Sequence, residues 1–320
     1  MSDRLSPTAA PRAPLGRYGI EVFRLCLGGN PFGWTADEAA SFAVLDAYLL
    51  AGGNFIDTAD VYSAWKPGNQ GGESETIIGR WAASRGVRDE VVIATKVAKW
   101  APRRGLAPDN IAAAIEGSLD RLQTDHVELF YAHQEDPQTP LEDSLAALHE
   151  LVEQGKAGAI GLSNFRAATI ESALEICDRR GLARPIAVQP HYSLIAREQA
   201  AVVELCAREG LACLPYYALG SGFLTGKYRP GTAVDSPRAA RAARYLEDPR
   251  AEGLLSVLDG VAAARSTSLA AIAIAWLREQ PGVLAPIASA RTPEQLAAIM
   301  PGATLALSDA ELAALAGAWS

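Results

Sequence analysis

The sequence predicts an α/β protein built as one (β/α)8 (TIM) barrel. Eight short, almost uninterrupted apolar segments recur along the 320 residues, and such segments are typical of parallel strands buried on both faces. Segments with helix-capping residues lie between them, which gives repeating strand–helix units of about 25 to 40 residues. An open doubly wound sheet is the main alternative, but the number of strand segments favours the closed barrel.

The chain is expected to begin with a flexible tail and a β-hairpin. Residues 1–13 are polar and contain two prolines, so we expect them to be flexible, and residues 14–320 then form a single domain. Two glycines in residues 16–19 separate Leu15 from a β-like run, which predicts a hairpin turn. The barrel strands are expected at residues 25–28, 55–57, 91–96, 127–133, 159–163, 186–189, 211–216 and 284–288.

Capping residues indicate where several helices begin and end. In four places Ser or Thr stands three residues before Glu or Gln, a pattern that caps helix N-termini: residues 35–38, 139–142, 292–295 and 308–311. Gly52 and Gly155 are placed to end the first two of these helices, because glycine readily adopts the left-handed conformation found there.

One interval is much longer than the others. About seventy residues separate Tyr216, at the end of the seventh strand, from Ala288 in the eighth. They include a Gly/Ser-rich segment at 220–222, an Arg/Ala-rich stretch at 237–250 and two helical patterns. The sequence therefore predicts a long loop and helical insertion after strand 7, on the active face of the barrel.

Composition excludes several classes of protein. The hydrophobic share of 49% and charged share of 21% are those of an ordinary globular protein. A net charge of −8 argues against a nucleic-acid-binding protein, and no apolar stretch is long enough to cross a membrane. The four cysteines show no CxxC spacing and no signal peptide is apparent, so we expect free thiols and a reducing cytoplasm.

Four polar side chains follow three successive predicted strands. Asp57 ends the second strand, Lys96 the third and His133 the fourth, while Tyr62 lies five residues beyond Asp57. Catalytic groups of a barrel project from the carboxyl ends of its strands, and neighbouring strands are about 4.8 Å apart. We therefore expect these four side chains to converge.

Together the four groups can hold and protonate a carbonyl oxygen. The Lys96 ammonium should favour the phenolate form of Tyr62 and ease release of its proton, with Asp57 balancing the lysine charge. A neutral His133 can orient the carbonyl oxygen and share its developing charge. Hydride must come from a cofactor, because no side chain donates one.

These residues resemble the tetrad of the aldo-keto reductase family. The motif Asp57-x-Ala-x-x-Tyr62, the pair Thr95-Lys96 and the strand ending at His133 carry the resemblance, which extends over roughly residues 14–315. The resemblance implies a (β/α)8 fold, no metal, and NAD(P)H bound in an extended form across the rim. Tyr62 would be the general acid in the reversible reduction of an aldehyde or ketone by the cofactor.

The same resemblance implies a cofactor site. Ser163, Asn164 and Gln189 would bind the nicotinamide carboxamide, and Tyr216 would stack on the ring. The pyrophosphate would lie on the Gly-rich segment after strand 7; the residues assigned there are Leu219, Gly220, Gly222 and Lys227.

The adenosine end of the cofactor would lie at the last strand. Ser289, Arg291 and Gln295 stand at a helix N-terminus suited to a 2′-phosphate, which indicates NADPH, with NADH possible. Ala298 and Ile299 depart from the acidic residue and asparagine that family members often have near the adenine.

Residues for substrate binding are less clearly indicated. Trp34, Trp65 and Trp100 follow the first three strands and Gln134 follows His133, so they could line an apolar or sugar-binding pocket. The loop at 63–72, beside Tyr62, is expected to be flexible and to act as a substrate lid.

Three functions are compatible with this sequence. The first is an NADPH-dependent carbonyl reductase with a small-molecule substrate. The second is a barrel aldolase that uses Lys96 as a Schiff-base nucleophile, although Asp57 would keep that lysine charged. The third is a nucleotide-binding regulatory protein of the same fold, resembling channel subunits.

Overall fold

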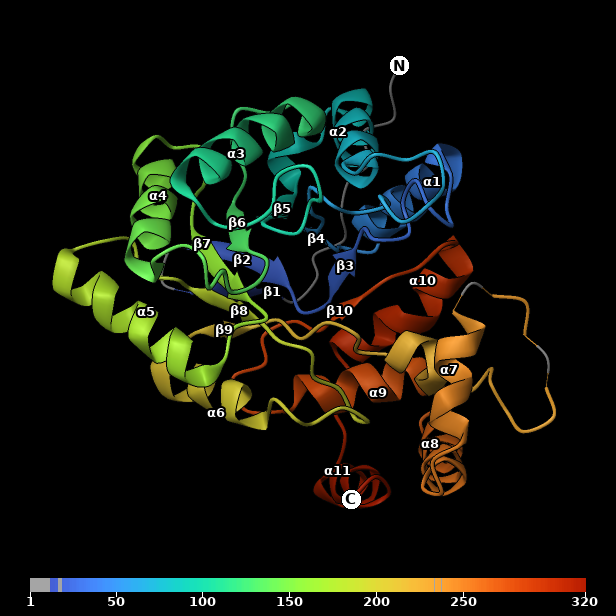
Figure 1. The fold of residues 1–320 in the computed structure, drawn as a ribbon. Coiled ribbons are helices and arrows are strands. Elements are labelled where there is room, and N and C mark those ends of the chain that lie inside the picture. Colours follow the sequence, from blue (N-terminus) through green and yellow to red (C-terminus); the bar gives the residue numbers. More distant parts are fainter. Residues whose placement is uncertain (1–11, 17–18, 233, 237) are drawn as a thin grey trace.

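The computed structural model describes residues 12–16, 19–232, 234–236 and 238–320, and the barrel prediction is confirmed (Figure 1). Eight strands lie parallel in the order β10-β3-β4-β5-β6-β7-β8-β9. Their bounds are β3 Cys26–Gly28, β4 Phe55–Asp57, β5 Val92–Val97, β6 Leu129–Ala132, β7 Ile160–Ser163, β8 Ala187–Gln189, β9 Ala212–Cys213 and β10 Ile287–Ala288.

The ring of strands closes between β9 and the segment that leads into β10. Cys213 pairs in parallel with Val283. The Cys213 N–H donates to the Gly282 carbonyl at 3.0 Å, and the Leu284 N–H donates to the Cys213 carbonyl at 2.9 Å. Because all eight strands run parallel in this ring, their carboxyl ends face one rim.

Helices surround the strands, as Figure 1 shows. Their bounds are α1 Glu38–Leu50, α2 Glu73–Arg85, α3 Pro108–Leu122, α4 Leu141–Glu153, α5 Ala167–Arg180, α6 Ala200–Glu209, α9 Leu269–Arg278, α10 Pro293–Ile299 and α11 Asp309–Gly317. The insertion after β9 contains the 3-10 turn Gly220–Thr225, α7 Ala239–Leu246 and α8 Ala251–Ala264, so the predicted helical insertion is confirmed. Short 3-10 turns also occur at Arg88–Glu90 and Met300–Ala303.

A hairpin covers the amino-terminal end of the barrel. Strands β1 (Arg12–Leu15) and β2 (Ile20–Phe23) pair antiparallel, which confirms the predicted hairpin. The Asn54 side chain, directly before β4, accepts from the Phe23 N–H and donates to the Glu21 carbonyl, both at 2.8 Å. Arg12 and Ala13, which the sequence assigned to the tail, lie in β1; the rest of that predicted tail lies outside the described residues.

Two apolar layers hold the barrel together. One fills its interior, where hairpin residues pack with strand residues; this cluster includes Leu15, Val22, Phe55, Leu129, Tyr131 and Leu214. The other lies between the strands and the surrounding helices. The polar site residues are therefore held above a closed apolar interior.

Two of the predicted helix caps are confirmed. Thr292 accepts from the Gln295 N–H at the start of α10, with a proline at the first position. Ser308 and Glu311 form a complete capping box at α11. Gly52 and Gly155 both have positive φ just past their helix ends, as predicted.

The other two predicted caps are wrong. Asp37, rather than Thr35, caps α1 with its carboxylate. Helix α4 begins after Pro140 without a side-chain cap, because the Thr139 hydroxyl donates to Asp136 at 2.8 Å. At α1 the carboxylate is the stronger acceptor, whereas at α4 the N-cap position falls on Pro140, one residue beyond Thr139.

All four cysteines are buried free thiols, as predicted. Within the described ranges, no single helix is both long and apolar enough to cross a membrane; α8 and α9 together meet the length and composition test, but they are bent by 96°.

Candidate active site

Two of the strand-end residues predicted from the sequence, Asp57 and Lys96, meet Tyr62 in one hydrogen-bonded cluster, and His133 borders it. Asp57 ends β4 and Lys96 lies in the next strand, β5. The Lys96 ammonium donates to Asp57 Oδ2 at 2.7 Å, to the Thr58 carbonyl at 2.7 Å and to the Tyr62 hydroxyl at 3.0 Å. The Tyr62 hydroxyl in turn donates to Asp57 Oδ2 at 3.1 Å. The loop of Tyr62 therefore folds back over the rim, as expected.

All three Lys96 protons are used in this cluster. Lys96 is fully buried and Asp57 nearly so. A Schiff base requires a neutral amine with a free lone pair, whereas this ion pair stabilises the ammonium. The geometry therefore argues against the aldolase alternative.

The pKa of Tyr62 shifts in the direction opposite to that expected. Burial, followed by the Asp57 carboxylate, raises the pKa of the Tyr62 phenol well above its ordinary value. The expected lowering by Lys96 does not prevail, because Asp57 lies within hydrogen-bond distance of the same hydroxyl. Tyr62 is consequently a neutral phenol at physiological pH.

His133 follows β6 directly and is neutral, as predicted. Burial lowers its pKa well below the ordinary value, and the ammonium groups of Lys96 and Lys99 add to the effect. The His133 N–H donates to the Val97 carbonyl at 2.9 Å, and its carbonyl accepts from Asn164 at 2.8 Å. The imidazole lies edge-on to the Tyr62 ring at 6.2 Å, so both rings border the same space.

The residues expected to bind a carboxamide lie at the ends of β7 and β8. Asn164 donates to Ser163 Oγ at 3.0 Å, and its own amide oxygen accepts from the Tyr216 hydroxyl at 2.6 Å. Tyr216 stacks on His191, with 5.3 Å between ring centroids and 18° between planes. These contacts fix the Tyr216 ring beside the cluster, so its predicted stacking role is sterically possible.

Gln189 has a partner that the sequence did not suggest. Its amide nitrogen donates to Asp57 Oδ1 at 2.8 Å, across 132 residues of sequence. Asp57 thus accepts bonds from Gln189, Lys96 and Tyr62. Gln189 still lines the cavity described next, and its role toward a carboxamide stays a prediction.

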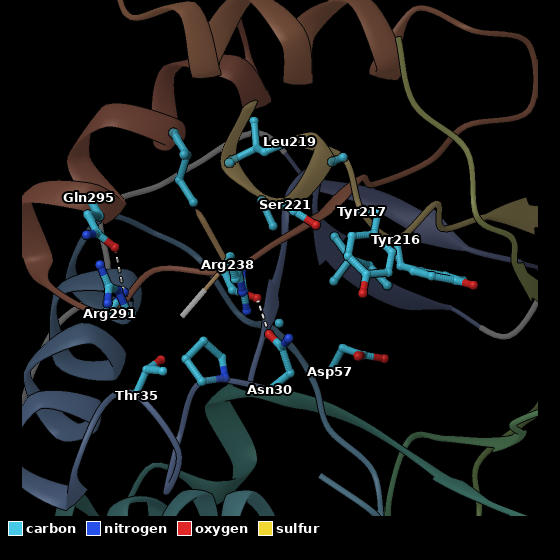
Figure 2. A pocket seen from close by; sticks show the side chains of 18 of the residues that line it. Asn30, Thr35, Asp57, Tyr216, Tyr217, Leu219, Ser221, Arg238, Arg291 and Gln295 are labelled. Carbon is cyan, nitrogen blue, oxygen red and sulfur yellow. Dashed lines mark hydrogen bonds between the residues drawn. The ribbon is translucent and has the colours of Figure 1, made fainter. Parts of the chain in front are cut away.

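An elongated cavity of about 590 Å³ opens at this rim. Figure 2 shows Asp57 and Tyr216 at one end, Arg291 and Gln295 at the other, and Arg238 between them. The lining includes most of the predicted cofactor residues: Ser163, Asn164, Gln189, Tyr216, Leu219, Gly222, Lys227, Ser289, Arg291 and Gln295. One continuous surface therefore joins the cluster of Asp57 and Tyr62 to the predicted phosphate site.

Gly220 is the exception among the predicted cofactor residues. It has a φ of 52°, its ideal Cβ would lie 2.4 Å from Ile195 Cδ1, and it is not among the cavity residues. Ser221, which the sequence analysis did not select, lines the cavity with a φ of 57°.

The α10 end of the cavity is ordered by local hydrogen bonds. The Arg291 N–H donates to Gln295 Oε1 at 3.0 Å, and Ser289 donates to Asn30 at 2.6 Å. The Arg291 guanidinium forms no ion pair with the described residues. It is therefore available to an anion.

Two cationic residues of the cavity were missed by the sequence analysis. Arg238 lies over the Trp34 ring at 5.5 Å, and burial lowers its pKa. Lys99 lines the cavity beyond His133, and burial together with the Lys96 ammonium lowers its pKa to about 8. The arginine-rich stretch and the lysine after β5 were visible in the sequence, but nothing there showed which of these side chains face the cavity.

Only one of the predicted substrate residues lines the cavity. Trp65 does so, with its ring 6.0 Å from that of Tyr62. Trp34 packs edge-on against Trp65, and Trp100 donates to the Gln70 carbonyl at 2.7 Å. Trp34, Trp100 and Gln134 are not among the cavity residues, so the first two support the loops around it.

The loop at 63–72 is anchored at several points. Asn69 donates to the Gly33 and Ser63 carbonyls at 3.1 and 3.0 Å, and Glu73 accepts from two N–H groups of residues 70–71. These bonds tie the loop to its surroundings, and its flexibility and its role as a lid stay predictions.

Backbone strain is concentrated at this rim. Seven described residues other than glycine have positive φ, and five of them lie in the rim loops: Ser63, Ala98, Asn164, Tyr217 and Ser221. Such conformations cost about 1–3 kcal/mol each and are retained where the surrounding structure and function require them.

A (β/α)8 barrel with a buried Asp–Lys–Tyr cluster at one end of a long rim cavity has the architecture of a barrel oxidoreductase. Comparison with known proteins gives the family. The model of the Aldo/keto reductase family matches residues 24–320, and the chain belongs to this family.

Several relatives are similar over most of their length. The uncharacterized oxidoreductase YrpG of Bacillus subtilis is 37% identical, over 88% of this chain and 87% of its own. Norsolorinic acid reductase stcV of Emericella nidulans is 34% identical, over 95% and 83%. A probable voltage-gated potassium channel subunit beta of Oryza sativa subsp. japonica is 33% identical, over 88% of each chain. The family and these relatives identify the chain as an oxidoreductase.

Proposed function

We propose that this protein reduces an aldehyde or ketone with NADPH, reversibly, and that Tyr62 is the general acid. The observation that carries the proposal is the position of the Tyr62 hydroxyl, which contacts both Lys96 and Asp57 at the inner end of the cavity. We further propose that the protein acts in a reducing cytoplasm, where four buried thiols remain unpaired.

The cavity fits a phosphorylated dinucleotide. Lys227, Arg238 and Arg291 line it away from the catalytic cluster, and none of them pairs with a carboxylate of the described residues. Among the described residues that line it, Asp57 alone is acidic, and it is already paired with Lys96. An anionic cofactor would supply the missing charge, with its nicotinamide between Tyr216 and Asn164.

The chain's own residues would then control the carbonyl oxygen. Bound NADPH supplies the hydride. Tyr62 donates its proton to the oxygen as negative charge develops, because an alkoxide is a stronger base than even a phenolate of raised pKa. Lys96 remains charged beside the phenolate and limits the cost of forming it. The neutral His133 orients the same oxygen by donating a hydrogen bond.

The test is NADPH oxidation against a panel of aldehydes, ketones, keto-sugars and quinones, with Tyr62→Phe as the comparison. The variant keeps the ring and loses only the acid, so turnover should fall by about 10²-fold or more. NADPH affinity, measured by fluorescence titration, should stay within a few-fold. Unchanged turnover in Tyr62→Phe would overturn the mechanism.

A regulatory role is the second candidate, because one relative bears the name of a potassium channel subunit. On that reading the protein would bind the nucleotide with little turnover. Turnover of simple carbonyls that depends on Tyr62 would favour the reductase.

A further inference from the structure

One positive charge in the cavity is not explained by the catalytic cluster. Lys99 follows β5 and lines the cavity together with Tyr62 and His133. It is partly buried, and it forms no ion pair with a carboxylate of the described residues. A lysine that loses water without gaining an anionic partner is unfavourable, so its position suggests an anion that is supplied by a ligand.

The cofactor phosphates are poorly placed to be that anion. In the closed ring, β5 lies four strands from β9 and three from β10. Lys227 follows β9 and Arg291 follows β10, so the proposed phosphate sites lie across the rim from Lys99. Lys99 thus stands on the side left for the substrate.

The chain holds Lys99 at this place by a constrained backbone. Ala98, directly before it, has a φ of 116°, a conformation that is unusual for a residue other than glycine. The Ala98 carbonyl accepts from the Gly105 N–H at 3.0 Å, which closes the loop after β5. Strain maintained next to a cavity residue is typical of a functional position.

The charge around Lys99 is also unbalanced. Lys96 is neutralised by Asp57, and His133 is neutral, so Lys99 carries the remaining charge at the catalytic end. Lys96 and burial lower the Lys99 pKa to about 8, which leaves the group mostly protonated at pH 7. An anionic ligand would stabilise its ammonium form.

We propose that Lys99 binds a carboxylate of the carbonyl substrate and makes the enzyme prefer aldehyde or keto acids to neutral carbonyls. The inference rests on the proposed reductase function and extends it to a substrate class. Lys99 acts as a specificity residue, while the reacting oxygen stays with Tyr62 and His133.

Matched aldehydes test the proposal. The probes are 3- and 4-carboxybenzaldehyde and their methyl esters, which keep the aldehyde and differ in one charge. The wild-type protein should have at least tenfold higher kcat/KM for the better acid than for its ester. Lys99→Met should remove this preference by raising KM for the acid, with kcat for the esters within about twofold.

Lys156→Met is the control. It removes the same charge from the exposed pair with Glu116, outside the cavity, and should keep the preference for the acid. Equal kcat/KM for acid and ester in the wild-type protein, or equal losses for both in Lys99→Met, would overturn the proposal.

A binding measurement separates this inference from the proposed function. Calorimetry with NADP+-saturated protein should show benzoate binding at least tenfold tighter than benzamide, and Lys99→Met should remove the difference. If no carbonyl is reduced but benzoate binds through Lys99, the reductase proposal fails and the anion site stands. If carbonyls are reduced and benzoate binds no better than benzamide, the anion site fails alone.

Discussion

At the scale of single residues, Asp57 organises the site. Its two carboxylate oxygens accept hydrogen bonds from Gln189, Lys96 and Tyr62. These three residues lie in β8, in β5 and in the loop after β4. The pair with Lys96 is buried, so removal of either charge would leave the other without compensation. The position of the Tyr62 hydroxyl, the proposed acid, therefore depends on a carboxylate that does not itself need to exchange a proton.

Asp60, three residues beyond Asp57, gives a prediction of pH-dependent stability. It is buried, one of its oxygens has no partner among the described residues, and burial and Glu75 raise its pKa from 3.8 to about 7. Between these two values the native state binds more protons than the unfolded chain, so the Asp60 contribution to stability falls as the pH rises through this window.

Asp60→Asn should therefore stabilise the protein at pH 8 by about 1–3 kcal/mol, because no charge is then buried. At pH 5 the native aspartate is protonated while the unfolded one is ionised, so the stabilisation by the substitution should be clearly smaller there than at pH 8. Urea unfolding of both proteins at the two pH values measures the difference. The same change in unfolding free energy at pH 5 and pH 8 would contradict the assignment.

At the scale of elements, helices α2 and α3 approach each other closely at Gly79. An ideal Cβ on Gly79 would lie 2.4 Å from the Arg121 carbonyl oxygen and 2.6 Å from the Leu122 carbonyl carbon. These are backbone atoms, so the helices must move apart to accept a methyl group. In α8, by contrast, Gly253 is exposed and has no atom within 4 Å of its ideal Cβ.

The same substitution should thus have opposite effects at the two sites. Gly79→Ala should destabilise the protein by about 1–3 kcal/mol through overpacking. Gly253→Ala should stabilise it by about 0.5–1 kcal/mol, because alanine restricts the unfolded chain and suits a helix interior. Thermal and urea unfolding measure both, and a stabilising Gly79→Ala would show that α2 and α3 are not in the described contact.

The N-terminus of α10 should determine the choice between NADPH and NADH. Arg291 stands just before the Thr292 cap, and its guanidinium lines the cavity without an ionic partner in the described chain. Arg291→Ala should weaken NADPH binding by about 1.5–3 kcal/mol, the range for a hydrogen bond to a charged group. NADH lacks the 2′-phosphate and is the matched control, so its Kd should change little. Equal losses for both cofactors in fluorescence titrations would refute this role.

At the scale of the whole molecule, the sequence predicted the barrel because burial on both faces leaves a distinct apolar signal in each strand. It also placed Asp57, Lys96 and His133 correctly, because strand ends follow directly from those runs. The bond from Gln189 to Asp57 was not predictable, since it depends on curvature that brings β8 and β4 together across the barrel.

The closed fold also explains why the sequence analysis did not select two cationic residues of the cavity. In the sequence, Lys99 and Arg238 are ordinary charged residues between predicted elements. Both line the cavity because of how the folded barrel arranges its loops. The Tyr62 pKa was predicted in the wrong direction for a related reason. The effect of a charged neighbour depends on burial and on the competing carboxylate, and both are properties of the folded molecule.

The insertion after β9 connects distant parts of the rim. Arg238, at the start of α7, lies over Trp34 in the loop after β3, two strands further round the ring. A cation–π contact of this kind is worth about 0.5–2 kcal/mol. The contact therefore places the insertion over the middle of the cavity, where Figure 2 shows Arg238.

Arg238→Ala should consequently speed the release of NADPH by about tenfold, which corresponds to the loss of roughly 1.4 kcal/mol. The variant loses both the Trp34 contact and a charge that faces the cavity. Arg244→Ala, an exposed position on the same helix outside the cavity, removes the same charge and should leave the release rate unchanged. Stopped-flow displacement of NADPH measures both rates. Equal rates in Arg238→Ala and the wild-type protein would show that the insertion does not retain the cofactor, whereas equal acceleration in both variants would indicate a general effect of net charge.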